Sequence, residues 1–87
     1  MRCRWDDENV HHIARHGVTP DEALEVLVDE ATVHAPSRGR QSAYGTTRDG
    51  RPLRVIYDVI NAEELRVTTA YQIRRTVLAR VREEAER

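Results

Sequence analysis

The segment from residue 5 to residue 27 constrains the fold most, because it carries the signals of two short helices separated by a glycine. Asp6 is a suitable N-cap for the first helix, since its carboxylate can accept the free backbone N–H groups of the first turn. Gly17 can adopt the left-handed conformation that ends a helix. The start of the second helix follows at once. Thr19 is its N-cap, Pro20 occupies the first helical position, and Glu22 completes a capping box with Thr19. The segment therefore predicts a tight helix–glycine–helix pair.

Both predicted helices have one apolar side. Apolar residues recur there at helical spacing, at Val10, Ile13 and Ala14 in the first helix and at Ala23, Val26 and Leu27 in the second. Two short helices cannot bury these residues against each other alone, so the pair needs a sheet to cover it.

The rest of the chain is typical of strands followed by one helix. Strands are expected at residues 1–5, 31–35, 40–47, 53–59 and 65–71, with Pro36 ending the second of them. Asp49-Gly50 predicts a hairpin turn, because both residues tolerate positive φ. Residues 53–59 carry apolar side chains on both faces and should be central. Residues 73–86 predict a helix with four inward positions, Ile73, Val77, Leu78 and Val81.

This order of elements predicts an α+β fold in one domain, residues 1–87. It comprises an N-terminal strand, two short helices, a mainly antiparallel four-strand meander and a C-terminal helix, with the helices on one face of a twisted sheet. At 87 residues without phenylalanine, the chain buries only about 60% of its unfolded surface, so its core is small.

Composition also indicates the cellular compartment of the protein. The longest apolar runs fall far below the roughly 20 residues of a membrane span, and no signal peptide is recognisable. Cys3 is the one cysteine, which rules out an internal disulfide and fits a reducing compartment. We expect a soluble, cytoplasmic protein in which Cys3 is a small core residue of the first strand.

Charge is distributed unevenly, although the net charge is only −1. Residues 6–30 contain eight acidic residues and one arginine, a net −7, whereas residues 36–54 contain five arginines and one aspartate, a net +4. The molecule is therefore polarised. All 14 basic residues are arginine, which suits bidentate phosphate contact. A GC-rich genome that favours arginine codons is the better explanation of this usage, so it is not by itself evidence of function.

Several short motifs together resemble the small BrnT-like toxins of bacterial type II toxin–antitoxin systems. The motifs are Trp5-Asp6, Asn9, His16-Gly17-Val18, Thr19 to Ala23, Tyr44-Gly45-Thr46, Gly50-Arg51 and Val67 to Ala70, before a basic C-terminal helix. The resemblance implies a RelE-like ribonuclease fold and RNA cleavage. The chain departs from the family where many relatives have Ala-Arg after the last strand, because Tyr71 follows Ala70 here. It also has Arg15-His16 in place of Lys-His.

The resemblance also implies partners. They are a cognate antitoxin that silences the toxin, in a complex expected to contain two copies of each chain, and an RNA substrate, with DNA bound only through the antitoxin. No membrane partner is expected. The basic segment from Pro36 to Arg54 offers an electrostatic target for an acidic, partly disordered antitoxin segment.

RNA cleavage without a metal needs a base for the 2′-hydroxyl, positive charge on the phosphate and an acid for the leaving oxygen. We predict six catalytic residues. Four of them contact the phosphate: Arg40, Arg51, Arg54 and Arg75. The other two, His16 and Tyr71, transfer protons. RNA-binding residues are expected at Arg15, Arg38, Tyr44 and Arg74. Arg40, Arg51 and Arg54 can converge because the Asp49-Gly50 turn joins their strands. Taken singly, each arginine also fits a solvated surface charge, and His16 also fits a helix C-terminal cap.

His12 and His16 have the i, i+4 spacing of a zinc pair, but a third ligand and a catalytic glutamate are absent, so no metal or cofactor is expected. The prediction is thus a toxin that inhibits growth as a metal-independent endoribonuclease on mRNA. The alternative is a non-catalytic protein-interaction module of the same fold.

Overall fold

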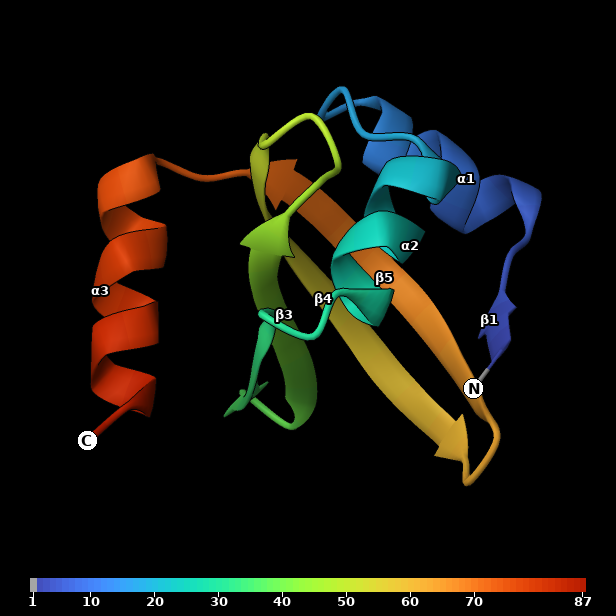
Figure 1. The fold of residues 1–87 in the computed structure, drawn as a ribbon. Helices are drawn as coiled ribbons and strands as arrows, with labels where there is room; N and C mark the ends of the chain where they lie inside the picture. The colour runs from blue at the N-terminus through green and yellow to red at the C-terminus, as the bar shows by residue number, and fades with distance from the viewer. Residues whose placement is uncertain (1) are drawn as a thin grey trace.

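A computed structural model describes residues 2–87, which form three helices and a five-strand sheet. In chain order the elements are β1 (Arg2–Arg4), α1 (Asp7–Ala14), α2 (Pro20–Val28), β2 (Val33–Ser37), β3 (Arg40–Thr46), β4 (Pro52–Asn61), β5 (Glu64–Gln72) and α3 (Arg75–Ala85) (Figure 1). The predicted α+β class is confirmed.

The sheet is mixed, with the strand order β1-β5-β4-β3-β2. β2 to β5 pair antiparallel with their chain neighbours, whereas β1 pairs parallel with β5 and places Cys3 opposite Leu65. The expected four-strand antiparallel meander therefore describes the sheet incompletely. β1 can lie parallel to β5 because the helix pair and three strands separate the two along the chain, which provides the long connection that a parallel pair requires.

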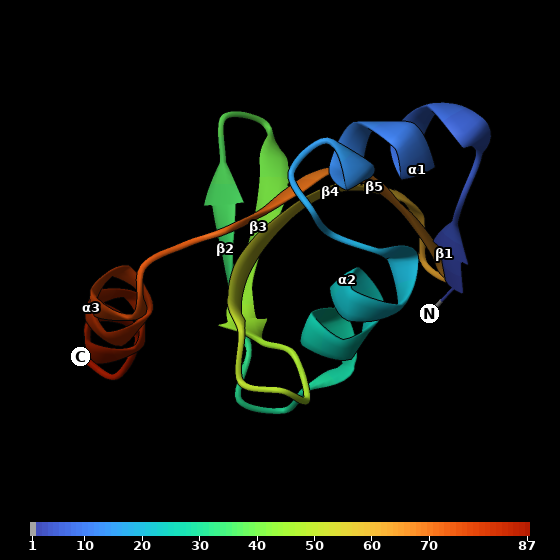
Figure 2. The ribbon, with the colours of Figure 1, turned by 90° about the horizontal axis from the view of Figure 1, so that it is seen from above.

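The helix pair covers one face of the sheet. α1 packs on β5, and α2 packs on β3 and β4 (Figure 2). Asp6 and Thr19 are the N-caps, as predicted, and each helix begins with a capping box. The pair and the inward side chains of the strands form one core, which includes Ile13, Val18, Ala23, Val26, Leu53, Val55, Val67 and Ala70.

The buried side of α1 differs from the prediction. Ile13 is fully buried, but Ala14 is exposed and the polar Asn9 lies in the interior instead. The Asn9 side-chain nitrogen donates to the backbone oxygens of Arg4 (3.1 Å) and Val67 (3.2 Å), while its oxygen accepts from the Asp6 backbone nitrogen (2.8 Å). Asn9 thus joins β1, α1 and β5 through satisfied hydrogen bonds, which is the condition for burying a polar group.

The C-terminal helix departs from the expectation that all helices share one face. α3 lies beside β2 and β3, on the far side of the sheet from α1 and α2 (Figures 1 and 2). Leu78 is its buried residue, whereas Val77, expected to point inward, is 37% exposed. With two helices already covering the inner face, α3 packs on the other one.

Pro36 does not end its strand. It lies inside β2, opposite Gln41 of β3. An edge strand tolerates proline because one side of it needs no backbone donor. None of the helices in residues 2–87 is both long and apolar enough to cross a membrane.

Candidate functional site

The sheet face opposite α1 and α2, which α3 covers beside β2 and β3 and which is called the open face below, has the guanidinium of Arg54 in β4 as its most densely connected polar group. Its strand neighbours Leu53 and Val55 are fully buried in the core, so Arg54 points to the other face. The cross-strand partners of Arg54 are Tyr44 on β3 and Tyr71 on β5. An arginine between two tyrosines therefore follows directly from the register of three strands.

Arg54 is held by hydroxyl groups from three strands. It donates from Nη1 to the Tyr71 hydroxyl (2.8 Å), from Nη2 to Ser37 Oγ (2.8 Å) and from Nε to Ser42 Oγ (3.2 Å). Its Cζ lies 5.3 Å from the ring centroid of Tyr44 and 5.9 Å from that of Tyr71, within cation–π range. No carboxylate among residues 2–87 forms an ion pair with Arg54. Its geometry is fixed, but its charge remains available to an anion.

His16 lies next to this group. Its ring centroid is 6.1 Å from that of Tyr71 and 5.8 Å from that of His12. Three of the predicted site residues, far apart in the sequence, are thus brought together near the end of β5. A fixed cation, a phenol hydroxyl and an imidazole are the group types that acid–base chemistry on a phosphate needs.

A groove of 460 Å³ opens beside Arg54. Arg54, Ser37, Arg38, Arg40 and Ile56 line it. Arg38 belongs to the turn between β2 and β3 and has a positive φ of 49°. Arg40 Nε lies 3.2 Å from Asp58 Oδ1, but both side chains are exposed, so this pair is weak and exchangeable. The groove therefore places two more cations beside the Arg54 group.

Arg51 occupies a different environment. Its Nη1 donates to the Gly17 carbonyl oxygen (2.8 Å) and to Glu22 Oε2 (2.9 Å), and its Nε donates to Gln72 Oε1 (2.9 Å). Partial burial raises the pKa of Glu22, but the hydrogen bond from the Thr19 backbone and the Arg51 guanidinium outweigh burial and lower that pKa. Arg51 is therefore matched by a carboxylate, unlike Arg54.

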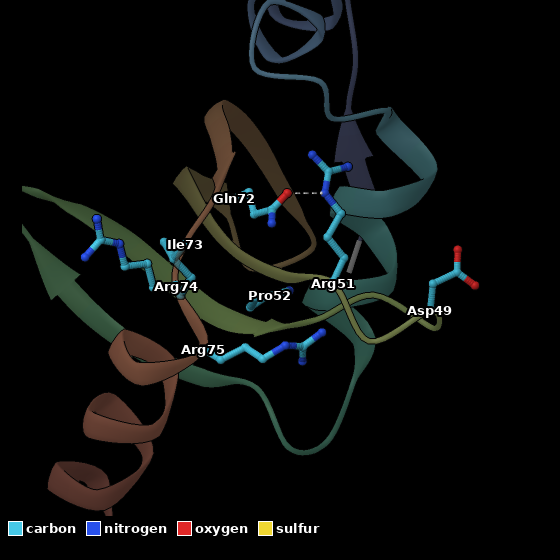
Figure 3. Close-up of a pocket in the computed structure, with 7 residues that line it drawn as sticks. All are labelled: Asp49, Arg51, Pro52, Gln72, Ile73, Arg74 and Arg75. Carbon is cyan, nitrogen blue, oxygen red and sulfur yellow. Dashed lines mark hydrogen bonds between the residues drawn. The ribbon is translucent and has the colours of Figure 1, made fainter.

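Arg74 and Arg75 lie at the start of α3, beside a second pocket of 630 Å³. Asp49, Arg51, Pro52, Gln72 and Ile73 complete its lining (Figure 3). Arg75 extends alongside Pro52, whereas Arg74 points away from Arg51 (Figure 3). The five arginines of residues 36–54 thus do not form one patch. Arg38, Arg40 and Arg54 line the groove on the open face, Arg51 lies at this end of the sheet, and Arg48 lies beside α2.

The remaining predicted residue, Arg15, lies apart from the Arg54 group. It follows α1 and lines a small pocket with Glu8, His11 and His12. In residues 2–87 no group of three or more His, Cys, Asp or Glu side chains is arranged to hold a metal ion. Cys3 is half-buried against the core, as expected, and burial raises the pKa of its thiol.

Sequence reasoning missed Ser37 and Ser42, the two serine partners of Arg54. Ser42 is fully buried, and neither serine belongs to a recognisable sequence motif. The available signal was strand alternation, since Ser42 and Tyr44 are two residues apart and must share a face.

Neither a protein-family model nor a curated protein matches the sequence.

Proposed function

We propose that the protein is the toxin of a bacterial type II toxin–antitoxin system, with a BrnT-like, RelE-like fold, and that it cleaves mRNA in the cytoplasm without a metal. The observation that carries the proposal is the Arg54 group: an arginine without a carboxylate partner, bonded to the Tyr71 hydroxyl, with the His16 ring 6.1 Å from that of Tyr71. The motif resemblance and the order strand, two helices, four strands and helix support it further.

The chemistry assigned to these residues is transfer of the phosphate to the neighbouring 2′-oxygen. The His16 imidazole takes the proton of the 2′-hydroxyl, whose oxygen attacks the phosphorus. Arg54 stabilises the negative charge that builds up on the phosphate oxygens. Tyr71 gives its proton to the departing 5′-oxygen, and because the Tyr71 oxygen already accepts a hydrogen bond from Arg54, its own proton is directed elsewhere. The products are a 2′,3′-cyclic phosphate and a 5′-hydroxyl.

The substrate-binding residues surround this centre. Arg38 and Arg40 line the groove beside Arg54 and contact flanking phosphates. The ring of Tyr44 offers a surface on which an unpaired base can stack. Arg74 and Arg75 attract the RNA strand where it extends beyond the β-sheet. Exposed, unstacked bases are needed for such contacts, so the substrate is single-stranded.

Cleavage of a single-stranded RNA in EDTA tests the proposal. The Arg54→Ala variant should lose about 10²-fold or more in rate, the cost of removing one donor to a developing oxyanion. Arg48→Ala is the matched control, because Arg48 lies on the β3–β4 turn beside α2 rather than on the open face. Intact RNA with the wild-type protein, or equal rates for wild type and Arg54→Ala, would refute the assignment.

We also propose that an acidic antitoxin segment covers the basic open face, in a complex that contains two copies of each chain and that binds DNA through the antitoxin alone. The segment 36–54 carries the net charge of +4 that such a partner would meet. Covering Arg38, Arg40 and Arg54 would block the RNA site directly.

A non-catalytic interaction module is the second candidate. It is favoured by Leu24 and Val28 on the outer side of α2, which are 40% and 68% exposed. Expression without the adjacent gene separates the two functions, because a nuclease arrests growth whereas a binding module leaves growth unchanged.

A further inference from the structure

The guanidinium of Arg51 bridges the immediate chain neighbours of two proposed catalytic residues. Its Nη1 donates to the carbonyl oxygen of Gly17, which follows His16, and its Nε donates to the side chain of Gln72, which follows Tyr71. Figure 3 shows the Arg51 and Gln72 side chains directed toward each other. The α1–α2 turn and the end of β5 are therefore joined through one side chain of the β3–β4 hairpin.

We propose that Arg51 is a positioning residue that sets the separation of His16 and Tyr71, an inference that rests on the function proposed above. Arg51 is unsuited to bind the reacting phosphate itself, because Glu22 Oε2 lies 2.9 Å from its Nη1. The side chains of Arg51 and Glu22 are only 27% and 26% exposed, so this pair is screened less than a surface pair.

The turn that carries His16 needs such a tie. α1 ends at Ala14, Gly17 has a φ of 71°, and the exposed His16 ring lies beside the rings of His12 and Tyr71 rather than in the core. Backbone hydrogen bonds close the turn locally, from the His16 nitrogen to Ile13 and from the Gly17 nitrogen to Ala14. These bonds do not reach the sheet. Arg51 supplies a polar connection from the turn to the strand end that carries Tyr71.

The shape of arginine accounts for this role. Its planar fork directs Nη1 and Nε to fixed positions, so one group bonds the turn and Glu22 while the other bonds Gln72. A lysine ammonium keeps the charge and one contact with Glu22, but it cannot span the separate acceptors in the same geometry. Arg51→Lys therefore removes the bridge and retains the positive charge.

The test combines NMR with kinetics. In the wild type we expect a nuclear Overhauser contact between the rings of His16 and Tyr71. In Arg51→Lys we expect this contact to be lost and kcat to fall about tenfold or more, as for loss of an orienting partner. KM should change by less than a factor of about 2. Gln72→Ala, which removes one exposed acceptor, should weaken the contact and kcat in the same direction. It also tests the bridge if Arg51→Lys does not fold.

The alternative role gives the opposite pattern. If Arg51 binds phosphate, Arg51→Lys keeps the ring contact and kcat, while KM rises, and the proposal is overturned. Arg75→Lys is the matched control and should leave the ring contact unchanged. The ring contact is measured without RNA, so its persistence in both Arg51→Lys and Gln72→Ala refutes the positioning role even if the wild-type protein cleaves no RNA. Absence of cleavage alone refutes only the proposed nuclease activity.

Discussion

At the scale of single residues, the same residue type has opposite roles three positions apart. Arg51 faces Glu22 and backbone or amide acceptors, whereas Arg54 faces only hydroxyl groups and aromatic rings. The first environment neutralises the charge and fixes the fold, while the second fixes the side chain and preserves the charge. A catalytic cation needs both rigidity and an unmatched charge, and Arg54 meets this requirement.

Asn9 is a buried polar residue whose side chain joins three elements. Replacing it with alanine leaves the Arg4 and Val67 carbonyl oxygens without these donors at a buried position and removes half of the α1 capping box. We expect Asn9→Ala to lower the free energy of unfolding by about 2–4 kcal/mol, from about 1–3 kcal/mol for each unsatisfied buried group. Urea unfolding measures it. The exposed Asn61→Ala should cost less than about 1 kcal/mol, and equal losses for the two variants would contradict the role of Asn9.

At the scale of elements, the joint between α2 and the start of β4 depends on one carboxylate. The pKa of Glu22 is lowered from its ordinary value of 4.5 on folding. A lowered pKa means that the ionised form stabilises the native state above pH 4.5 and that this stability is lost as pH falls through the folded pKa. Glu22→Gln should therefore melt at a lower temperature than the wild type at pH 7, and the two proteins should converge on acidification toward pH 3. A difference in melting temperature that is constant across this range would show that the charge of Glu22 has no part in it.

The elements that sequence predicts well are those fixed by local chemistry. Both N-caps and the hairpin between β3 and β4 follow from residues within four positions of one another, and each is present. The turn itself is centred on Arg48-Asp49, one residue before the expected Asp49-Gly50, and of these residues Gly50 alone has a positive φ. The parallel pairing of β1 with β5 and the placement of α3 on the opposite face depend on contacts between distant segments. Pro36 shows the same limit, because only its position on an edge strand makes it acceptable within β2.

The candidate site follows the same division. Alternation along two strands joined by a turn was enough to expect Arg40 and Arg54 on one surface. Local patterns contain no information on Arg51, because its partners Gly17 and Glu22 are 34 and 29 residues away. The contact between His16 and Tyr71 likewise depends on how the α1–α2 turn meets the end of β5.

At the scale of the whole molecule, the charge asymmetry of the sequence becomes an asymmetry across the sheet. The segment of net charge −7 forms the helix pair on one face of the sheet. Three arginines of the segment of net charge +4 line the groove on the other face. A polyanion such as the proposed RNA substrate would be repelled by the first face and attracted by the second, so its orientation of encounter would be biased toward the Arg54 group. An acidic protein partner meets the same bias.

The proposed acidic antitoxin should therefore lose affinity when the basic face is reversed in charge. Arg38 and Arg40 are the residues to change, since both line the groove and both are exposed, so that folding is preserved. The double variant Arg38→Glu, Arg40→Glu should bind the purified product of the adjacent gene at least about tenfold more weakly at low salt, with a smaller loss near 1 M salt, where the Debye length falls to about 3 Å. Arg48→Glu is the control, because Arg48 lies beside α2. Unchanged affinity of the double variant at low salt would place the partner elsewhere, with the exposed Leu24 and Val28 of α2 as the first surface to mutate.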